Sequence, residues 1–148
     1  MASSYRYQMT ARWTTGRHGV AENASIQPKL DFAPPPEFQG EAGCWTPEYM
    51  LLAAVAACFV TTFLAIAGFS KFDLARLEVQ ADGEIEKAEG GFLFTRIYVR
   101  PTLTLRQEKD RDRGLRLLEK AERACLISRS LQSQIILEPE ITVMAEQA

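Results

Sequence analysis

Residues 46–69 read TPEYMLLAAVAACFVTTFLAIAGF, and this stretch decides the fold. Thr46 has a side chain that can cap a helix, and Pro47 suits the first helical position. Glu48 complements the positive start of the helix dipole. Residues 49–69 are nearly all apolar, so the stretch predicts a long helix that begins at this cap.

The length of this helix approaches the ~20 apolar residues that a membrane span needs. Its composition argues against a span, because Ala is abundant, Thr61 and Thr62 lie near the middle, and the flanks show no marked Lys/Arg asymmetry. A helix that is apolar on all sides also suits the centre of a soluble domain or dimer. We therefore expect a buried central helix that stops near Gly68, and no membrane partner.

The segments before this helix predict a small strand pair. Residues 5–13 alternate as a strand, residues 17–19 form a turn, and residues 20–30 predict a returning strand. A loop follows, with the proline run 34–36 and two glycines.

The segments after the helix predict a hairpin, a second helix and a strand. Residues 77–81 and 92–105 alternate on either side of Gly90–Gly91, and Pro101 in the second strand indicates an edge or a bulge. Residues 115–125 follow helical spacing, and residues 135–143 predict a final strand. This order predicts a single α+β domain over the whole chain, with two main helices on one face of an antiparallel sheet.

Composition narrows the class of protein. The chain has 148 residues, a net charge of −2 and 17 scattered basic residues, which argues against a nucleic-acid partner. Three cysteines without regular spacing do not resemble a secreted disulfide framework. Residues 1–6 lack an apolar core region and a cleavage signature, so we expect a cytoplasmic location.

The cysteines suggest the chemistry. Cys58 lies in the middle of the apolar helix, and Cys125 lies in the second helical segment between Arg123 and Arg129. Neither belongs to a Cys-x-x-Cys pair, which argues against a thioredoxin-type motif or a zinc knuckle and leaves a dithiol from two distant parts of the fold. His18 is the only histidine, and we expect neither a His-based metal site nor a cofactor.

Four motifs occur together in a characteristic order: GRHG at 16–19, TPE at 46–48, CF at 58–59 and AERACLIS at 121–128. Together they resemble the OsmC/Ohr family, the osmotically inducible protein C and organic hydroperoxide resistance proteins. The resemblance covers essentially the whole chain. It implies an intertwined homodimer that acts as a thiol peroxidase on organic hydroperoxides.

Carried over by motif, the resemblance makes Cys58 the peroxidatic cysteine, Cys125 the resolving cysteine and Arg17 with Glu48 an accompanying ion pair. It suggests an external reductant of lipoyl type or another small dithiol. The chain departs from the family at three positions: Thr46 replaces the usual Asn, Leu126 replaces the usual Pro after the second cysteine, and Cys44 is extra. With these departures, the motifs fit the OsmC branch, the Ohr branch and other OsmC-like branches alike.

The chemistry sets requirements of its own. Thiolate attack on a peroxide gives a sulfenic acid and an alkoxide, so the site must hold a thiolate. Cys58 lies about three turns into its helix, beyond the reach of the N-terminal dipole, and burial would raise its pKa. We therefore expect a nearby cation, with Arg17 as the best candidate and Glu48 orienting its guanidinium.

Apolar neighbours of Cys58 would favour bulky organic or fatty-acid hydroperoxides over hydrogen peroxide. The candidates for substrate contact are Leu51, Phe59 and Phe63.

Helix geometry bears on the dimer. Glu48 and Cys58 are ten residues apart, about 15 Å along one helix, so they cannot both contact one arginine across a small site. The simplest resolution is that Cys58 of one chain meets Glu48 and Arg17 of the other.

Each residue also has a plainer interpretation. A buried Cys in an Ala-rich helix is usually a small hydrophobe, Arg17 in a turn is usually solvated, and Glu48 is usually a dipole partner. The competing hypothesis is a non-catalytic dimeric module that binds an apolar ligand or a partner, with inert cysteines.

Overall fold

The computed structural model describes residues 3–145 and forms two compact units, residues 1–51 and 52–148. The sequence predicted one domain over residues 1–148. The single domain stays a prediction.

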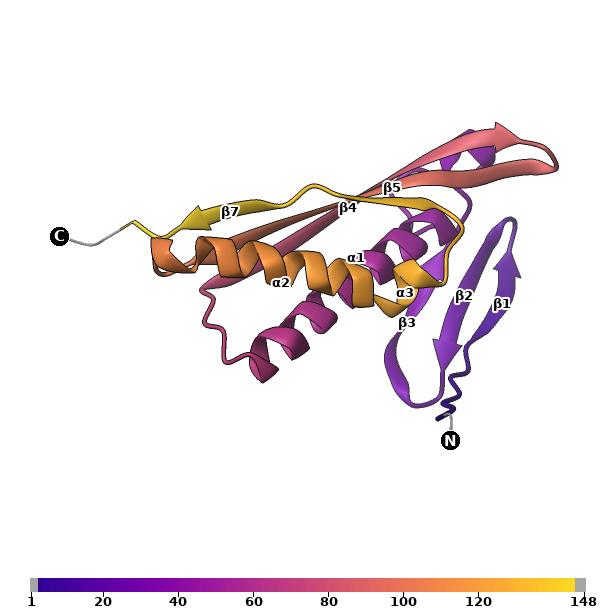
Figure 1. The fold of residues 1–148 in the computed structure, drawn as a ribbon. Coiled ribbons are helices and arrows are strands. Elements are labelled where there is room, and N and C mark those ends of the chain that lie inside the picture. Colours follow the sequence, from indigo (N-terminus) through magenta and orange to yellow (C-terminus); the bar gives the residue numbers. More distant parts are fainter. Residues whose placement is uncertain (1–2, 146–148) are drawn as a thin grey trace. The chain divides into compact units, whose positions relative to one another are not determined.

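The first unit contains a three-stranded antiparallel sheet with the order β1-β2-β3 (Figure 1). Its strands are β1 (Thr10–Thr15), β2 (His18–Asn23) and β3 (Ile26–Phe32). The single returning strand predicted over residues 20–30 is wrong, because a turn at Ala24–Ser25 divides it. The Asn23 side chain accepts a hydrogen bond from the Ser25 N–H at 2.8 Å, which is the local bond that makes Asn a turn former.

The first predicted strand and turn are also shifted. The strand begins at Thr10 rather than residue 5, and the turn lies at Gly16–Arg17, so that His18 already belongs to β2. Gly16 has a φ of 56°, in the left-handed region that favours glycine. Its carbonyl accepts a hydrogen bond from the Trp13 indole at 2.8 Å, which closes the turn.

A tight loop connects β3 to the long helix. It contains the short 3₁₀ helix η1 (Pro36–Phe38), and a Cβ atom at Gly40 would overlap the carbonyl oxygen of Pro34. Helix α1 (Pro47–Phe69) begins after Thr46, whose hydroxyl accepts the Tyr49 N–H at 3.0 Å. The predicted cap is therefore confirmed.

The second unit contains a four-stranded sheet built on a long antiparallel hairpin, β4 (Arg76–Ala88) and β5 (Gly91–Leu105). Gly90 and Gly91 both have positive φ at its tip, as the hairpin prediction requires. On its other side, β5 pairs in parallel with β6 (Gln134–Leu137) and β7 (Glu140–Val143). The α+β architecture with antiparallel sheets is confirmed, whereas the single final strand is divided in two.

Pro101 explains where the final strand divides. It lies in the centre of the sheet rather than at an edge or bulge, between the part of β5 that pairs with β6 and the part that pairs with β7. The same register sets Pro139 opposite Pro101. Neither proline has an N–H to donate to a neighbouring strand, so the ladder is interrupted there.

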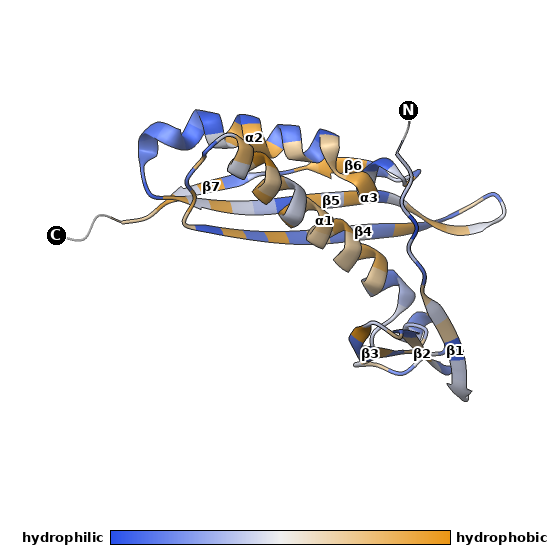
Figure 2. Cartoon of the chain, turned by 90° about the horizontal axis from the view of Figure 1, so that it is seen from below, coloured by the Kyte–Doolittle hydropathy of each residue, from blue (hydrophilic) through white to orange (hydrophobic). Residues whose placement is uncertain are grey.

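The core of the second unit lies between the sheet and its helices, which cover the same face (Figures 1 and 2). Alternate residues of β5 are buried on that face: Ile97, Val99, Leu103 and Leu105. Helix α1 contributes every fourth residue: Val55, Phe59, Phe63 and Ala67. Helix α2 (Arg111–Ala124) adds Leu117, Leu118 and Ala121.

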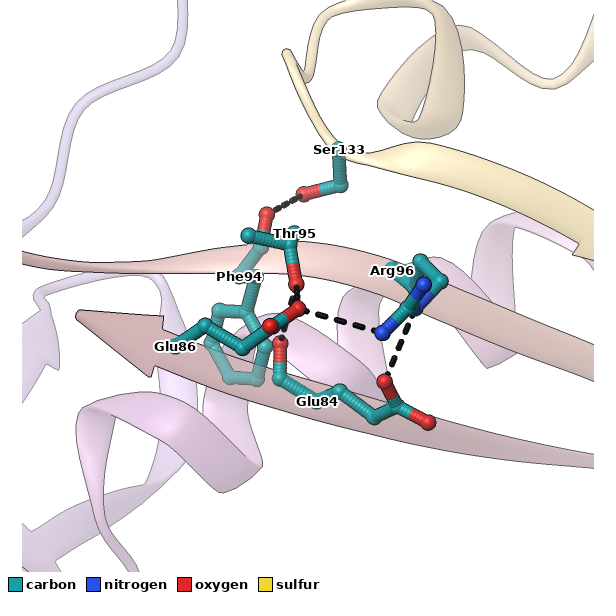
Figure 3. Close-up of polar contacts among 6 residues, drawn as sticks. All are labelled: Glu84, Glu86, Phe94, Thr95, Arg96 and Ser133. Carbon is teal, nitrogen blue, oxygen red and sulfur yellow. Dashed lines mark hydrogen bonds and ion pairs between the residues drawn. The ribbon is translucent and has the colours of Figure 1, made fainter. Parts of the chain in front are cut away.

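Polar contacts join the hairpin strands near a register shift between Glu84 and Ile85 (Figure 3). Arg96 forms ion pairs with Glu84 at 2.8 Å and with Glu86 at 3.2 Å. The hydroxyl of Thr95 hydrogen-bonds Glu86, and Ser133 donates to the Phe94 carbonyl at 2.7 Å. The last bond ties the segment before β6 to β5.

Helix α1 ends at Phe69, one residue after Gly68, so the predicted stop near Gly68 is confirmed. The residue that takes the left-handed conformation after the helix is Lys71, with a φ of 52°, and not Gly68. Within the described residues, α1 is the one helix that is long and apolar enough, by length and composition, to cross a membrane. Of its most apolar stretch of 18 residues, 22% is buried in the structure. Leu64 and Phe69 are exposed by 48% and 91%. The absence of a membrane partner therefore stays a prediction.

A substitution on β5 tests the position of the core. Leu103→Ala should lower the free energy of unfolding by about 2–5 kcal/mol, because Leu103 is fully buried and its removal leaves a cavity. Thr102→Ala, on the opposite face of the same strand, is the matched control and should cost far less. Urea unfolding followed by circular dichroism measures both, and equal losses would contradict this core.

Candidate active site

The second unit brings Cys58 and Cys125 together, although they are far apart in the sequence. The thiol of Cys125 hydrogen-bonds the sulfur of Cys58. Cys58 is half-buried on α1 beside the buried Phe59, and Cys125 exposes 1% of its surface. Both are free thiols in this structure.

Cys125 lies outside the helices, so the prediction that helical spacing continues through it is wrong. Its backbone is extended, with φ −64° and ψ 113°, and it separates α2 from the short helix α3 (Leu126–Arg129). The break turns the first amides of α3 toward Cys58, where the backbone N–H groups of Leu126 and Ile127 donate hydrogen bonds to the sulfur. The hydroxyl of Thr62, one helical turn after Cys58, lies 3.8 Å from the same sulfur.

These donors set the protonation state of Cys58. Burial acts to raise the pKa of the Cys58 thiol, but hydrogen bonds from Ile127, Cys125, Thr62 and Leu126 favour the thiolate, and the pKa lies below its ordinary value. Cys58 is therefore the group of the pair that ionises first.

Cys125 shifts in the opposite direction. Burial raises the pKa of the Cys125 thiol, and its hydrogen bond and charge interaction with Cys58 add to the rise, while contacts with Ser128 oppose it. Cys125 thus keeps its proton when Cys58 has lost its own, and donates it as a hydrogen bond. The two environments separate the roles of the pair.

Neutral donors supplied by tertiary packing lower the pKa of Cys58 within one chain, so this shift does not itself require a cation. A contribution from Arg17 stays a prediction. Thr62 could have been found from its i+4 spacing on one helix face. The amides of α3 could not, since their direction depends on the break at Cys125.

Arg17 and Glu48 lie together in the first unit, where both line a cavity of about 230 Å³. The cavity is otherwise lined by apolar residues: Phe32, Pro34, Pro35, Phe38 and Pro47. Arg17 donates a hydrogen bond to the Gln39 side chain at 3.0 Å, and no local pattern in the sequence points to this partner. Among residues 3–145, no ion pair joins Arg17 to Glu48.

Glu48, at the start of α1, has a buried carboxylate oxygen, Oε1, without a hydrogen-bond partner in the part of the chain that the structure describes. A buried, unpaired carboxylate oxygen is costly, by about 1–3 kcal/mol or more. A hydrogen-bond donor from water, a ligand or a second chain would offset this cost.

The predicted substrate contacts separate into two groups. Phe59 and Phe63 expose 1% or less of their surface and belong to the core of the second unit, so the structure assigns them to packing rather than to a substrate surface. Leu51 is half-buried, and its contact with a substrate stays a prediction.

Comparison with known proteins identifies the family. A family model described as OsmC-like protein matches residues 40–140. The chain is 27% identical over 144 residues to the uncharacterized protein YmaD of Bacillus subtilis, covering 95% of this chain and 96% of that protein. It is 25% identical over 126 residues to peroxiredoxin OsmC of Escherichia coli, and the match covers 85% of this chain and 87% of that protein.

A solved structure supports the same assignment. An organic hydroperoxide resistance protein OsmC from Legionella pneumophila is similar to this chain with a TM-score of 0.74 and 25% identity, covering 95% of this chain and all of that one. The chain belongs to the OsmC-like family, as its four motifs suggested.

Leu126 offers a direct test of the amide contacts. Leu126→Pro should raise the pKa of Cys58, because proline has no N–H to donate, and should therefore move the alkylation profile toward higher pH. Proline suits the first position of a helix, and the extended Cys125 before it accommodates a proline, so the fold should persist.

The matched control is Leu126→Ala, which keeps the N–H. The Leu126 side chain is 65% exposed, so its truncation should leave the profile in place. Iodoacetamide labelling of Cys58 across pH, read by mass spectrometry, measures both variants. Identical profiles for Pro and Ala would exclude a role for this amide.

Proposed function

We propose that this protein is a cysteine-based peroxidase that reduces organic hydroperoxides in defence against oxidative stress. The observation that carries the proposal is the contact between Cys58, whose pKa is lowered, and Cys125, whose pKa is raised. Membership of the OsmC-like family and the names of the relatives, peroxiredoxin and organic hydroperoxide resistance protein, support it.

The reaction has three steps. The Cys58 thiolate attacks one peroxide oxygen, the O–O bond breaks, and the products are a Cys58 sulfenic acid and an alkoxide that takes up a proton to become the alcohol. The Cys125 sulfur then attacks the sulfenic sulfur, which forms a disulfide and releases water. An external dithiol, of lipoyl type or another small dithiol, reduces the disulfide by exchange and is itself oxidised.

The environments of the two cysteines suit this order. The thiolate is the nucleophile toward a peroxide, and Cys58 is the cysteine that is ionised more readily. Cys125 stays protonated and in contact, so it is already adjacent when the sulfenic acid forms. Arg17 is proposed to face the developing oxyanion, with Glu48 orienting its guanidinium.

We further propose that the working form is a homodimer with composite sites. Glu48 and Cys58 are about 15 Å apart along α1, so one arginine cannot contact both within one chain. The buried, unpaired Oε1 of Glu48 and the largely uncovered apolar surface of α1 support a partner at this helix. Such a dimer would bury more than the roughly 2,000 Å² typical of permanent interfaces.

Peroxide turnover tests the roles of the cysteines. Cys58→Ser should abolish reduction of cumene hydroperoxide, since no thiolate remains to attack. Cys125→Ser should consume one equivalent of peroxide per chain and then stall as a sulfenic acid that dimedone traps at Cys58. Peroxide consumption and mass spectrometry are the measurements, with dihydrolipoamide and thioredoxin compared as reductants.

The same assay separates the competing hypothesis of a non-catalytic module. A module with inert cysteines should show no fast-reacting thiol at neutral pH and no peroxide-dependent disulfide. Continued turnover in Cys58→Ser would refute the assignment of the nucleophile.

Interface substitutions test the dimer. Leu64→Glu should convert the protein to monomers, because Leu64 is half-exposed on the apolar surface of α1 and a charge there opposes burial. Leu115→Glu, at a partly exposed position on α2, is the matched control and should stay dimeric. Sedimentation velocity measures both, and a wild-type monomer with full activity would contradict the proposal.

Complementation tests whether the sites are shared. Arg17→Ala and Cys58→Ser chains should each be inactive, and their mixed refolding should restore one working site per heterodimer. No recovery in heterodimers of confirmed composition would show that Arg17 and Cys58 act within one chain.

A further inference from the structure

A second cluster of reactive side chains lies in the first unit, away from the dithiol pair in the sequence. It consists of His18, Glu41 and Cys44, whose imidazole nitrogen, carboxylate oxygen and sulfur all lie within 4.8 Å of one another. The Nε2 atom of His18 is 3.2 Å from Oε2 of Glu41. His18 and Cys44 are half-buried and Glu41 is exposed.

A count of histidines alone does not reveal this cluster. A single histidine argues against a His-rich site but not against a mixed one. Imidazole, thiolate and carboxylate are the three ligand types that zinc uses in proteins. Ligands of one tetrahedral zinc lie about 3.5 Å apart, so side-chain shifts of about an ångström would bring all three onto one ion.

The plainer interpretation is an exposed ion pair beside an unrelated cysteine. An exposed pair of this kind stabilises a fold by at most ~1 kcal/mol, and it needs no thiol. The cluster differs from a simple ion pair because the Cys44 sulfur lies within 4.8 Å of both His18 and Glu41. Two of its members come from the loop before α1, whereas His18 starts β2, so an ion would join two separate segments.

Those two segments also hold Arg17. Arg17 directly precedes His18, and its hydrogen-bond partner Gln39 lies two positions before Glu41 in the same loop. An ion bound at the cluster would therefore hold the loop against the start of β2 and restrict the position of the guanidinium.

We propose that His18, Glu41 and Cys44 form a binding site for a zinc-like divalent cation, with a fourth position open, which fixes the loop that positions Arg17. The site does not depend on the peroxidase proposal and can be tested without turnover.

Cobalt titration of the full-length chain tests the site. A Cys58→Ser, Cys125→Ser background leaves Cys44 as the only thiol, so a thiolate-to-cobalt absorption band can arise from Cys44 alone. We expect one equivalent of Co²⁺ to produce the band and Zn²⁺ to displace it. Cys44→Ser in this background should abolish the band.

The remaining ligands are tested in the same background. His18→Gln and Glu41→Gln should each weaken binding by about tenfold or more, since even outer-shell partners of metal sites cost that much. Glu37→Gln, an acidic residue of η1 outside the cluster, is the matched control and should bind normally. Circular dichroism checks that each variant is folded.

A second readout follows the loop. Zn²⁺ should slow amide hydrogen exchange over residues 36–45 in the parent chain and leave exchange in the His18→Gln chain unchanged. Absence of the cobalt band at stoichiometric metal would overturn the proposal. An unchanged affinity in both His18→Gln and Glu41→Gln would also overturn it, because it would show binding by the thiol alone.

Discussion

The burial of one stripe of α1 against β5 is the constraint on which the dithiol pair depends. Phe59 and Phe63 are buried almost completely, and each is expected to contribute about 1.5–3 kcal/mol. That burial sets the rotation of the helix about its axis. Cys58 precedes Phe59 by one residue, about 100° around the helix, so it lies beside the stripe rather than within it. It is half-buried there, close to the end of α2.

The same arrangement separates the pKa values of the two cysteines. Cys58 accepts hydrogen bonds from neutral donors, the largest effect coming from the Ile127 amide, and its pKa is lowered despite burial. Cys125 is more deeply buried and beside a group that ionises first, so its pKa is raised. The departure from the family pattern at Leu126 matters physically here, because a proline at this position would have no N–H to donate.

The first unit holds charged side chains rather than reactive thiols beside its cavity. Arg17 and Glu48 share an apolar cavity, and the carboxylate has a buried oxygen with no donor among the described residues. The loop around them is tight enough that Gly40 admits no side chain. The unpaired carboxylate oxygen and the tight loop accord with the proposal that a second chain completes this site.

The sequence by itself determined the α+β class, the start of α1 and the long hairpin, because these depend on short-range signals: a Thr-Pro-Glu cap, period-two alternation and paired glycines. Its motifs also identified the family. Only the tertiary structure decided that Pro101 sits in a central strand and that Cys125 ends a helix. It alone revealed the neutral donors, with the Ile127 amide foremost, that lower the pKa of Cys58. These features depend on contacts between residues far apart in the chain, and local patterns carry no information about such contacts.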